Sequence, residues 1–279
     1  MNIRDISLAI TSVETDFSLV EQAWALAETW QAHLSCCLIG LQPDLQFTDG
    51  FYATAEGYRA AVEATEEHNA SFLKSARDYI NSKASSVEIR ETRAFGGAVA
   101  DAASVLARYS DLLIARAPKH PDRLKHGELI EGALFGASSP VLVLPESWQP
   151  AAVGKRALLA WDASREASRA VHDALRVLGP GSEVCIATVD ATVSPQGHGA
   201  APGRDIAAHL ARQNLKVSIQ NADGLGQTVG DRLLELAAGF GADMLIMGGY
   251  RHSKLMQRVI GGTTSFLVSQ STIPVFLSH

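Results

Sequence analysis

The chain has 279 residues, of which 47% are hydrophobic and 19% are charged, the balance of an ordinary globular protein. Its formal net charge of −6 argues against a nucleic-acid-binding protein, which normally presents a basic face. Apolar runs are too short to cross a bilayer, and residues 1–16 show no cleavable leader, so we expect a cytoplasmic protein without a membrane span.

In the first half of the chain, short apolar runs alternate with segments of helical periodicity. Strands are predicted at residues 6–11, 34–40, 87–94, 111–115 and 140–144. Helices are predicted at residues 18–33, 52–82, 98–109 and 128–137. Continuous apolar strands that alternate with helices indicate a parallel sheet covered on both faces.

The second half repeats this plan after a linker-like stretch at residues 146–155, ESWQPAAVGK. Strands are predicted at residues 156–161, 183–189, 216–221, 244–247 and 275–278. Helices are predicted at residues 165–178, 205–213, 228–240 and 257–271. Asp111 and Pro140 open runs in the first half as Asp243 and Pro274 do in the second. The repeat predicts two tandem domains, residues 1–147 and 155–279.

Ligands of open parallel sheets bind beyond the carboxyl ends of the strands, where the strand order reverses. In the second half, the loops at these ends contain Asp162, Val189 and the segment 248–264. The Asp162 carboxylate could accept hydrogen bonds from a ligand or cap the helix that follows, and Ser164 is a rival for the cap.

Residues 247–267 read MGGYRHSKLMQRVIGGTTSFL. Glycines permit close approach of backbone N–H groups to a phosphate, and a helix that starts near Thr263 and Thr264 would add its dipole and hydroxyls. The alternative is a tight turn followed by a helix that packs through small residues. Neither a Walker loop nor a dinucleotide fingerprint occurs in the chain.

The spacing of this segment resembles the nucleotide loop of the universal stress proteins. The resemblance also includes RALLAWDASREASRAVHDAL, VGDRLLELAAGFGADMLIMGGYRHSKL and STIPVFLSH, and so spans most of residues 156–279. The first half is similar in layout and in its DLLIARAP and SSPVLVLPE ends. The resemblance implies two tandem Rossmann-like domains of the adenine nucleotide alpha hydrolase-like type, each an α/β sandwich with a five-stranded parallel sheet.

The resemblance assigns roles residue by residue. Asp162 matches the acidic residue that holds adenosine in ATP-binding members, and Val189 matches the position whose backbone meets the adenine. Gly248 and Gly261 match the first and third glycines of the loop, and Thr264 matches a hydroxyl position near the phosphates.

Two positions depart from the family pattern. Arg251 stands where the second glycine belongs, and it would either clamp a phosphate or fill the pocket. Gly262 stands where serine or threonine belongs, which removes one donor that Thr263 and Thr264 could replace. An Arg251→Gly variant distinguishes the two roles of the arginine, because it gains affinity if Arg251 blocks the site and loses affinity if Arg251 clamps the ligand.

The first half departs further, so we do not expect it to bind a nucleotide. Thr11 or Ser12 occupies the place of the strand-end aspartate, Arg116 replaces the first glycine, and Glu128 stands where it would repel phosphate.

No catalytic set, paired carboxylates or metal-ligand cluster is evident, and we do not expect an enzyme beyond slow ATP hydrolysis. Cys36, Cys37 and Cys185 lack metal-ligand spacing and are expected to be buried, reduced thiols. One hypothesis is a stress-response protein whose second domain binds ATP, with Mg²⁺, as a regulatory ligand.

The second hypothesis is a scaffold without nucleotide that recruits a protein or an apolar ligand, and the third is an enzyme of the wider superfamily. The family pairs domains through their fifth strands, here residues 141–144 and 275–278. The chain is therefore expected to be a monomer with an internal pseudo-dimer or a homodimer.

Overall fold

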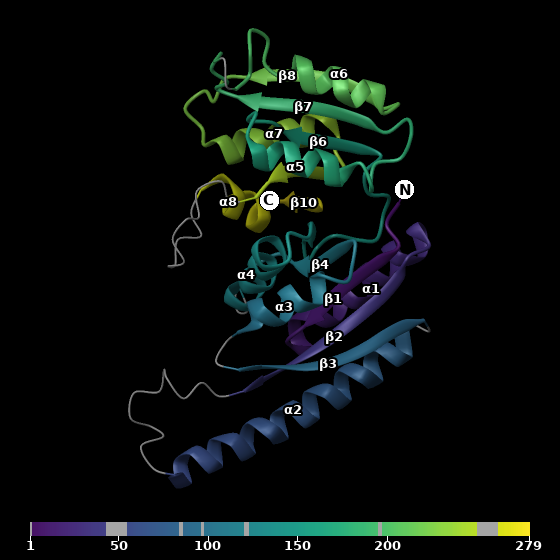
Figure 1. Ribbon diagram of the computed structural model, residues 1–279, viewed down its shortest axis with the longest axis vertical. Helices are drawn as coiled ribbons and strands as arrows, with labels where there is room; N and C mark the ends of the chain where they lie inside the picture. The colour runs from purple at the N-terminus through teal and green to yellow at the C-terminus, as the bar shows by residue number, and fades with distance from the viewer. Residues whose placement is uncertain are drawn as a thin grey trace. The chain divides into compact units, whose positions relative to one another are not determined.

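A computed structural model describes residues 2–42, 55–83, 86–95, 98–119, 123–194, 197–249 and 262–279 (Figure 1). The chain divides into two compact units. Arg4–Ser139 form the N-terminal unit, and Pro140–His279 together with Met1–Ile3 form the C-terminal unit.

The N-terminal unit is a parallel sheet with the strand order β3-β2-β1-β4. Its elements are β1 (Asp5–Ile10), α1 (Val13–Trp30), β2 (His33–Gln42), α2 (Ala55–Lys83), β3 (Val87–Phe95), α3 (Val99–Ala107), β4 (Leu112–Arg116), α4 (Arg123–Glu131) and the π-helical segment η1 (Gly132–Gly136). The long helix α2 runs along β2 and β3 (Figure 1).

The C-terminal unit has the strand order β5-β10-β9-β6-β7-β8. Its elements are β5 (Val141–Leu144), β6 (Arg156–Ala160), α5 (Arg165–Ala174), β7 (Glu183–Val189), α6 (Arg204–Arg212), β8 (Lys216–Ala222), α7 (Val229–Phe240), β9 (Met244–Gly248), α8 (Thr263–Gln270) and β10 (Val275–Ser278). All neighbouring pairs are parallel except β5 and β10, which are antiparallel.

The predicted α/β class is confirmed, and the central strands are buried along their length because helices cover both faces. The predicted pairing of the fifth strands is present, with Leu142 opposite Phe276. That pairing groups β5 with the C-terminal unit, so the compact units divide at Ser139 and Pro140, earlier than the linker predicted at residues 146–155.

Several element boundaries differ from those predicted. Helix α1 begins at Val13 rather than at residue 18, because the Asp16 side chain accepts the backbone N–H groups of Thr11 and Ser12 and closes the turn that precedes the helix. The helix predicted at residues 128–137 begins at Arg123 and ends in η1. None of the described helices is both long and apolar enough to span a membrane.

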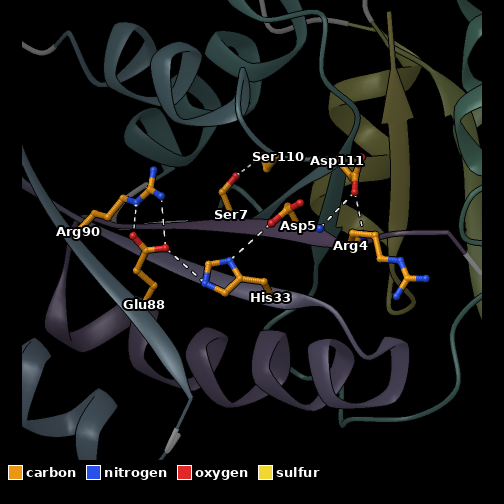
Figure 2. A network of polar contacts seen from close by, with 8 residues as sticks. All are labelled: Arg4, Asp5, Ser7, His33, Glu88, Arg90, Ser110 and Asp111. Atoms are coloured by element: carbon orange, nitrogen blue, oxygen red, sulfur yellow. Dashed lines mark hydrogen bonds and ion pairs between the residues drawn. The ribbon is translucent and has the colours of Figure 1, made fainter.

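The aspartates that mark the internal repeat have the same role in each unit. Asp111 accepts the backbone N–H groups of Arg4 and Asp5 at 2.8 and 3.2 Å, at the amino end of β1 (Figure 2). Asp243 accepts those of Gly154, Lys155 and Arg156 at 2.8 to 3.0 Å, at the amino end of β6. These aspartates therefore fix the amino edges of the sheets.

Other side chains at the amino edge of the N-terminal sheet continue this network (Figure 2). His33 lies 3.6 Å from Asp5 and 3.3 Å from Glu88, while Ser7 and Ser110 share a hydrogen bond. The guanidinium of Arg90 donates to Glu88 and, as the main cause, lowers the pKa of that carboxyl. The network joins the starts of all four strands of the N-terminal sheet.

The strand order reverses between β6 and β9 in the C-terminal unit and between β1 and β4 in the N-terminal unit. Ligands of open α/β sheets bind at the carboxyl edge beside this switch point. The two switch points are therefore the places to compare.

Candidate functional site at the C-terminal switch point

Three of the predicted site residues lie at the same edge of the C-terminal sheet. Gly248 ends β9, Asp162 follows β6 and Val189 ends β7, and these strands are neighbours in the order β9-β6-β7. Residues that are 27 to 86 positions apart in the sequence are thereby brought to one side of the switch point.

Ser164, and not Asp162, is the N-cap of helix α5. The Ser164 hydroxyl accepts the backbone N–H of Ala167 at 3.1 Å and is the N-cap. Asp162 is exposed, and its Oδ1 accepts the N–H of Ser164 at 3.0 Å. Asp162 is therefore not needed as the helix cap, and its carboxylate is accessible from solvent at the carboxyl edge.

The peptide groups of Val189 face the switch point. The C=O of Ala187 accepts the N–H of Trp161 on the β6 side of β7, whereas the N–H of Asp190 donates to Ala222 on the β8 side. Because successive residues of a strand face opposite neighbours, the N–H and C=O of Val189 point to the β6 side. Strand β6 ends at Ala160, so these two groups lie beyond its end, beside the Asp162 loop.

Gly248 has a packing reason of its own. A Cβ atom built on Gly248 would lie 2.5 Å from the backbone nitrogen of Ala167 and 2.8 Å from Cβ of Glu166. Only glycine lets the first turn of α5 pack this closely against the end of β9. The glycine thus positions the loop between Asp162 and α5, whatever binds there.

Helix α8 begins at the carboxyl edge. Its N-cap, Gly262, has φ of +96°, which favours glycine, and makes no side-chain cap hydrogen bond. Thr263 and Thr264 form its first turn and are half-buried. Arg251 and Gly261 lie outside the described residues, so their predicted contacts with phosphate stay predictions.

Two titratable residues near Gly248 were not singled out for this edge by the sequence. Glu166 in the first turn of α5 is 7% exposed, and the ring of His279 lies 2.9 Å from the carbonyl oxygen of Gly249 through Nδ1. Burial raises the pKa of Glu166, but hydrogen bonds from its own backbone and Arg165, with the nearby His279, outweigh burial and lower it. The sequence signal for Glu166 was its place in the first turn of a helix after a strand-end aspartate.

Left-handed backbone conformations gather at the same edge. Ala163 (φ 56°), Asp190 (φ 50°) and Leu225 (φ 52°) lie in the loops after β6, β7 and β8. Non-glycine residues adopt this conformation at a cost of about 1–3 kcal/mol each, and such residues cluster at binding sites. The carboxyl edge therefore stores backbone strain next to Asp162 and Val189.

The N-terminal switch point is filled by its own side chains. The Asp16 carboxylate accepts backbone N–H groups of Thr11 and Ser12 at 2.8 and 3.1 Å, and its other oxygen lies 2.9 Å from His126 Nε2. Asp16 and His126 are 1% and 2% exposed. The loop after β1 is thus closed from within, where the C-terminal unit presents the exposed Asp162.

Arg116 fills the other side of the N-terminal switch point. It ends β4, as Gly248 ends β9, and its guanidinium donates to Gln22 at 2.8 Å and to Ser18 at 2.7 Å. The side chain is only 4% exposed and lies against α1. Burial, followed by the neighbouring Glu131, raises the pKa of Glu128, which stands in the place predicted to repel phosphate.

Comparisons with known proteins match the C-terminal half by sequence and the whole chain by fold. Residues 154–279 match the model of the Universal stress protein family. A universal stress protein from Archaeoglobus fulgidus DSM 4304 has a TM-score of 0.69 at 16% identity, over 98% of this chain and 95% of that protein.

Two further solved structures have the same fold. A proposed universal stress protein from Pseudomonas aeruginosa UCBPP-PA14 has a TM-score of 0.50 at 16% identity, over 99% of this chain and 93% of its own. A functionally unknown protein from Pseudomonas aeruginosa PAO1 has a TM-score of 0.50 at 15% identity, over 99% of this chain and 92% of its own. No curated protein sequence matches the chain.

Proposed function

We propose that the C-terminal unit, whose residues 154–279 are a universal stress protein domain, binds an adenine nucleotide as the regulatory ligand of a stress-response protein. The base lies at Val189, the ribose at Asp162, and the phosphates at the start of α8. ATP is the first candidate.

The observation that carries this proposal is the orientation of Val189. One N–H donor and one C=O acceptor face the space beyond the end of β6. Adenine offers a matching pair on one edge, an amino donor at N6 beside a ring-nitrogen acceptor. Asp162, exposed in the next loop, supplies the carboxylate that ribose hydroxyl groups favour.

The phosphates extend toward α8. The positive end of the helix dipole and the N–H groups after Gly262 favour an anion, and the hydroxyls of Thr263 and Thr264 add donors. Among the described residues, no group of three or more histidine, cysteine, aspartate or glutamate side chains could hold a metal ion. A Mg²⁺ ion would therefore arrive with the triphosphate, which is the usual way that this ion binds.

Asp162→Ala tests the placement of the ribose. Loss of hydrogen bonds to a charged acceptor costs about 1.5–3 kcal/mol, so we expect ATP affinity to fall about 10- to 150-fold in titration calorimetry of the full chain. Asp205→Ala, at an exposed aspartate in the first turn of α6, is the matched control and should bind ATP as the unmodified chain does.

The outcomes separate the proposal from its alternative. An unchanged affinity of Asp162→Ala would remove Asp162 from the site. No heat from the unmodified chain at millimolar ATP would contradict nucleotide binding altogether and favour the scaffold that recruits a protein or apolar ligand.

A further inference from the structure

A contact between the loops after β7 and β8 stands next to the proposed base site. Asp190, the residue after Val189, accepts the backbone N–H of Gly224 through Oδ1 at 2.9 Å. The backbone N–H of Asp190 in turn donates to Ala222 at 3.0 Å. Asp190 thus joins the end of β7 to the chain just beyond β8 through both its backbone and its side chain.

The contact is specific for the residues that make it. Asp190 has φ of 50°, a left-handed conformation that aspartate and asparagine tolerate better than most residues. A Cβ atom on Gly224 would lie 2.6 Å from Asp190 Oδ2, so position 224 accepts no larger residue while the carboxylate keeps its place. Asp190 and Gly224 together form what we name the β7–β8 latch.

A second cross-strand hydrogen bond supports the latch from inside the sheet. The Thr188 hydroxyl donates to Asn221 Oδ1 at 2.8 Å, directly before Val189 and Asp190. On its other side Val189 has no strand, because β6 has already ended. The direction of the Val189 peptide groups therefore depends on contacts made toward β8.

We propose that Asp190 is a positioning residue for the base: the β7–β8 latch holds the Val189 N–H and C=O in the direction that accepts adenine and rejects guanine. This inference rests on the proposed function and goes beyond it by naming what sets base specificity. Guanine carries an acceptor at position 6 where adenine carries a donor, so its edge meets a fixed peptide with the wrong polarity. A fixed peptide discriminates, whereas a peptide that can turn does not.

The test uses ATP and GTP titrations of the full chain with variants on both sides of the latch. Asp190→Gly removes the carboxylate and tolerates the left-handed φ without steric cost. Gly224→Ala displaces the same carboxylate from the opposite loop. Each is expected to weaken ATP binding about three- to tenfold, the effect of one hydrogen bond, and to lower the preference for ATP over GTP.

Two variants serve as controls. Asp190→Asn keeps an acceptor for the Gly224 N–H and favours the left-handed φ, so it should retain the affinity and base preference of the unmodified chain. Asp223→Ala removes an exposed carboxylate one residue before Gly224 and should also leave both unchanged. Circular dichroism and the thermal midpoint of each variant show that the fold is retained.

The outcomes are distinct for the two proposals. Absence of ATP binding by the unmodified chain overturns both. Binding by the unmodified chain with the same ATP-to-GTP preference in Asp190→Gly and Gly224→Ala overturns the latch alone. If Asp190→Gly or Gly224→Ala is unfolded, the folded one of the two is compared with Asp190→Asn. An equal preference for ATP over GTP in these two proteins contradicts the latch.

Discussion

Asp16→Ala is expected to lower the free energy of unfolding of the N-terminal unit by about 3 kcal/mol, the upper end of the cost of leaving buried donors without their acceptor. The carboxylate accepts the N–H groups of Thr11 and Ser12 and lies 2.9 Å from His126 Nε2. Alanine leaves these buried donors without their acceptor. Urea unfolding of the full chain, followed by circular dichroism and tryptophan fluorescence, measures the loss.

Two substitutions in the same helix calibrate this result. Asp16→Asn keeps one acceptor oxygen and should cost less than alanine. Glu28→Ala, at an exposed position of α1, should change the free energy of unfolding by no more than about 0.5 kcal/mol. If Asp16→Ala costs no more than Glu28→Ala, the switch point of the N-terminal unit is not held by this carboxylate.

Gly132→Ala is expected to cost about 3 kcal/mol, the upper end of the usual range for overpacking a close contact. A Cβ atom at Gly132 would lie 2.1 Å from the backbone oxygen of Ala100, and one at Gly136 would lie 2.5 Å from Ser104 Oγ. Glycines four residues apart therefore let η1 pack directly on the backbone of α3. A backbone atom cannot move aside as a flexible side chain can.

Gly239→Ala in α7 is the matched control because no atom lies within 4 Å of the added Cβ. It should stabilise the protein by up to about 1 kcal/mol, the difference in helix propensity between glycine and alanine. Opposite signs for the two Gly→Ala changes in thermal unfolding would support the packing account. A neutral Gly132→Ala would show that η1 and α3 can separate at little cost.

Much of the fold could be predicted because its signals are local or repeated. Apolar runs and helical periodicity locate the strands and helices, and their alternation implies parallel strands. Asp111 and Asp243 were informative because Asp111 accepts backbone N–H groups at the start of β1 and Asp243 accepts those at the start of β6. Because both units need a carboxylate at this point, aspartate occurs at the corresponding position of each half.

The contents of the two switch points could not be read from the sequence. His126 and Asp16 are 110 residues apart, and Arg116 and Gln22 are 94 apart, so no local pattern links them. The sequence indicated that Arg116 replaces a glycine, but not that its side chain would be buried against α1. Long-range contacts decide which switch point is filled.

Gly248 shows a further limit of sequence motifs. Its place in the loop pattern suggested contact with phosphate, yet the structure supplies a packing reason in the backbone of Ala167. A glycine can therefore match a motif because a helix packs on it, even where a ligand also benefits. The contact between Asp190 and Gly224 is the opposite case. The nucleotide-loop motif does not include it, and it can be recognised only once β7 is seen to pair with β8.

The carboxyl edges of the two units differ in their side chains. The N-terminal unit satisfies its switch point with Asp16, His126 and Arg116. The C-terminal unit keeps an exposed Asp162 and the peptide groups of Val189 beside its switch point. We therefore propose that one unit of the chain binds a nucleotide and the other does not.

Native mass spectrometry of the full chain with ATP and Mg²⁺ tests this proposal, because it counts bound nucleotides per chain. We expect one ATP per chain, with lower occupancy in Asp162→Ala and unchanged occupancy in Asp205→Ala. Two ATP molecules per chain, or none at millimolar ATP, would contradict it.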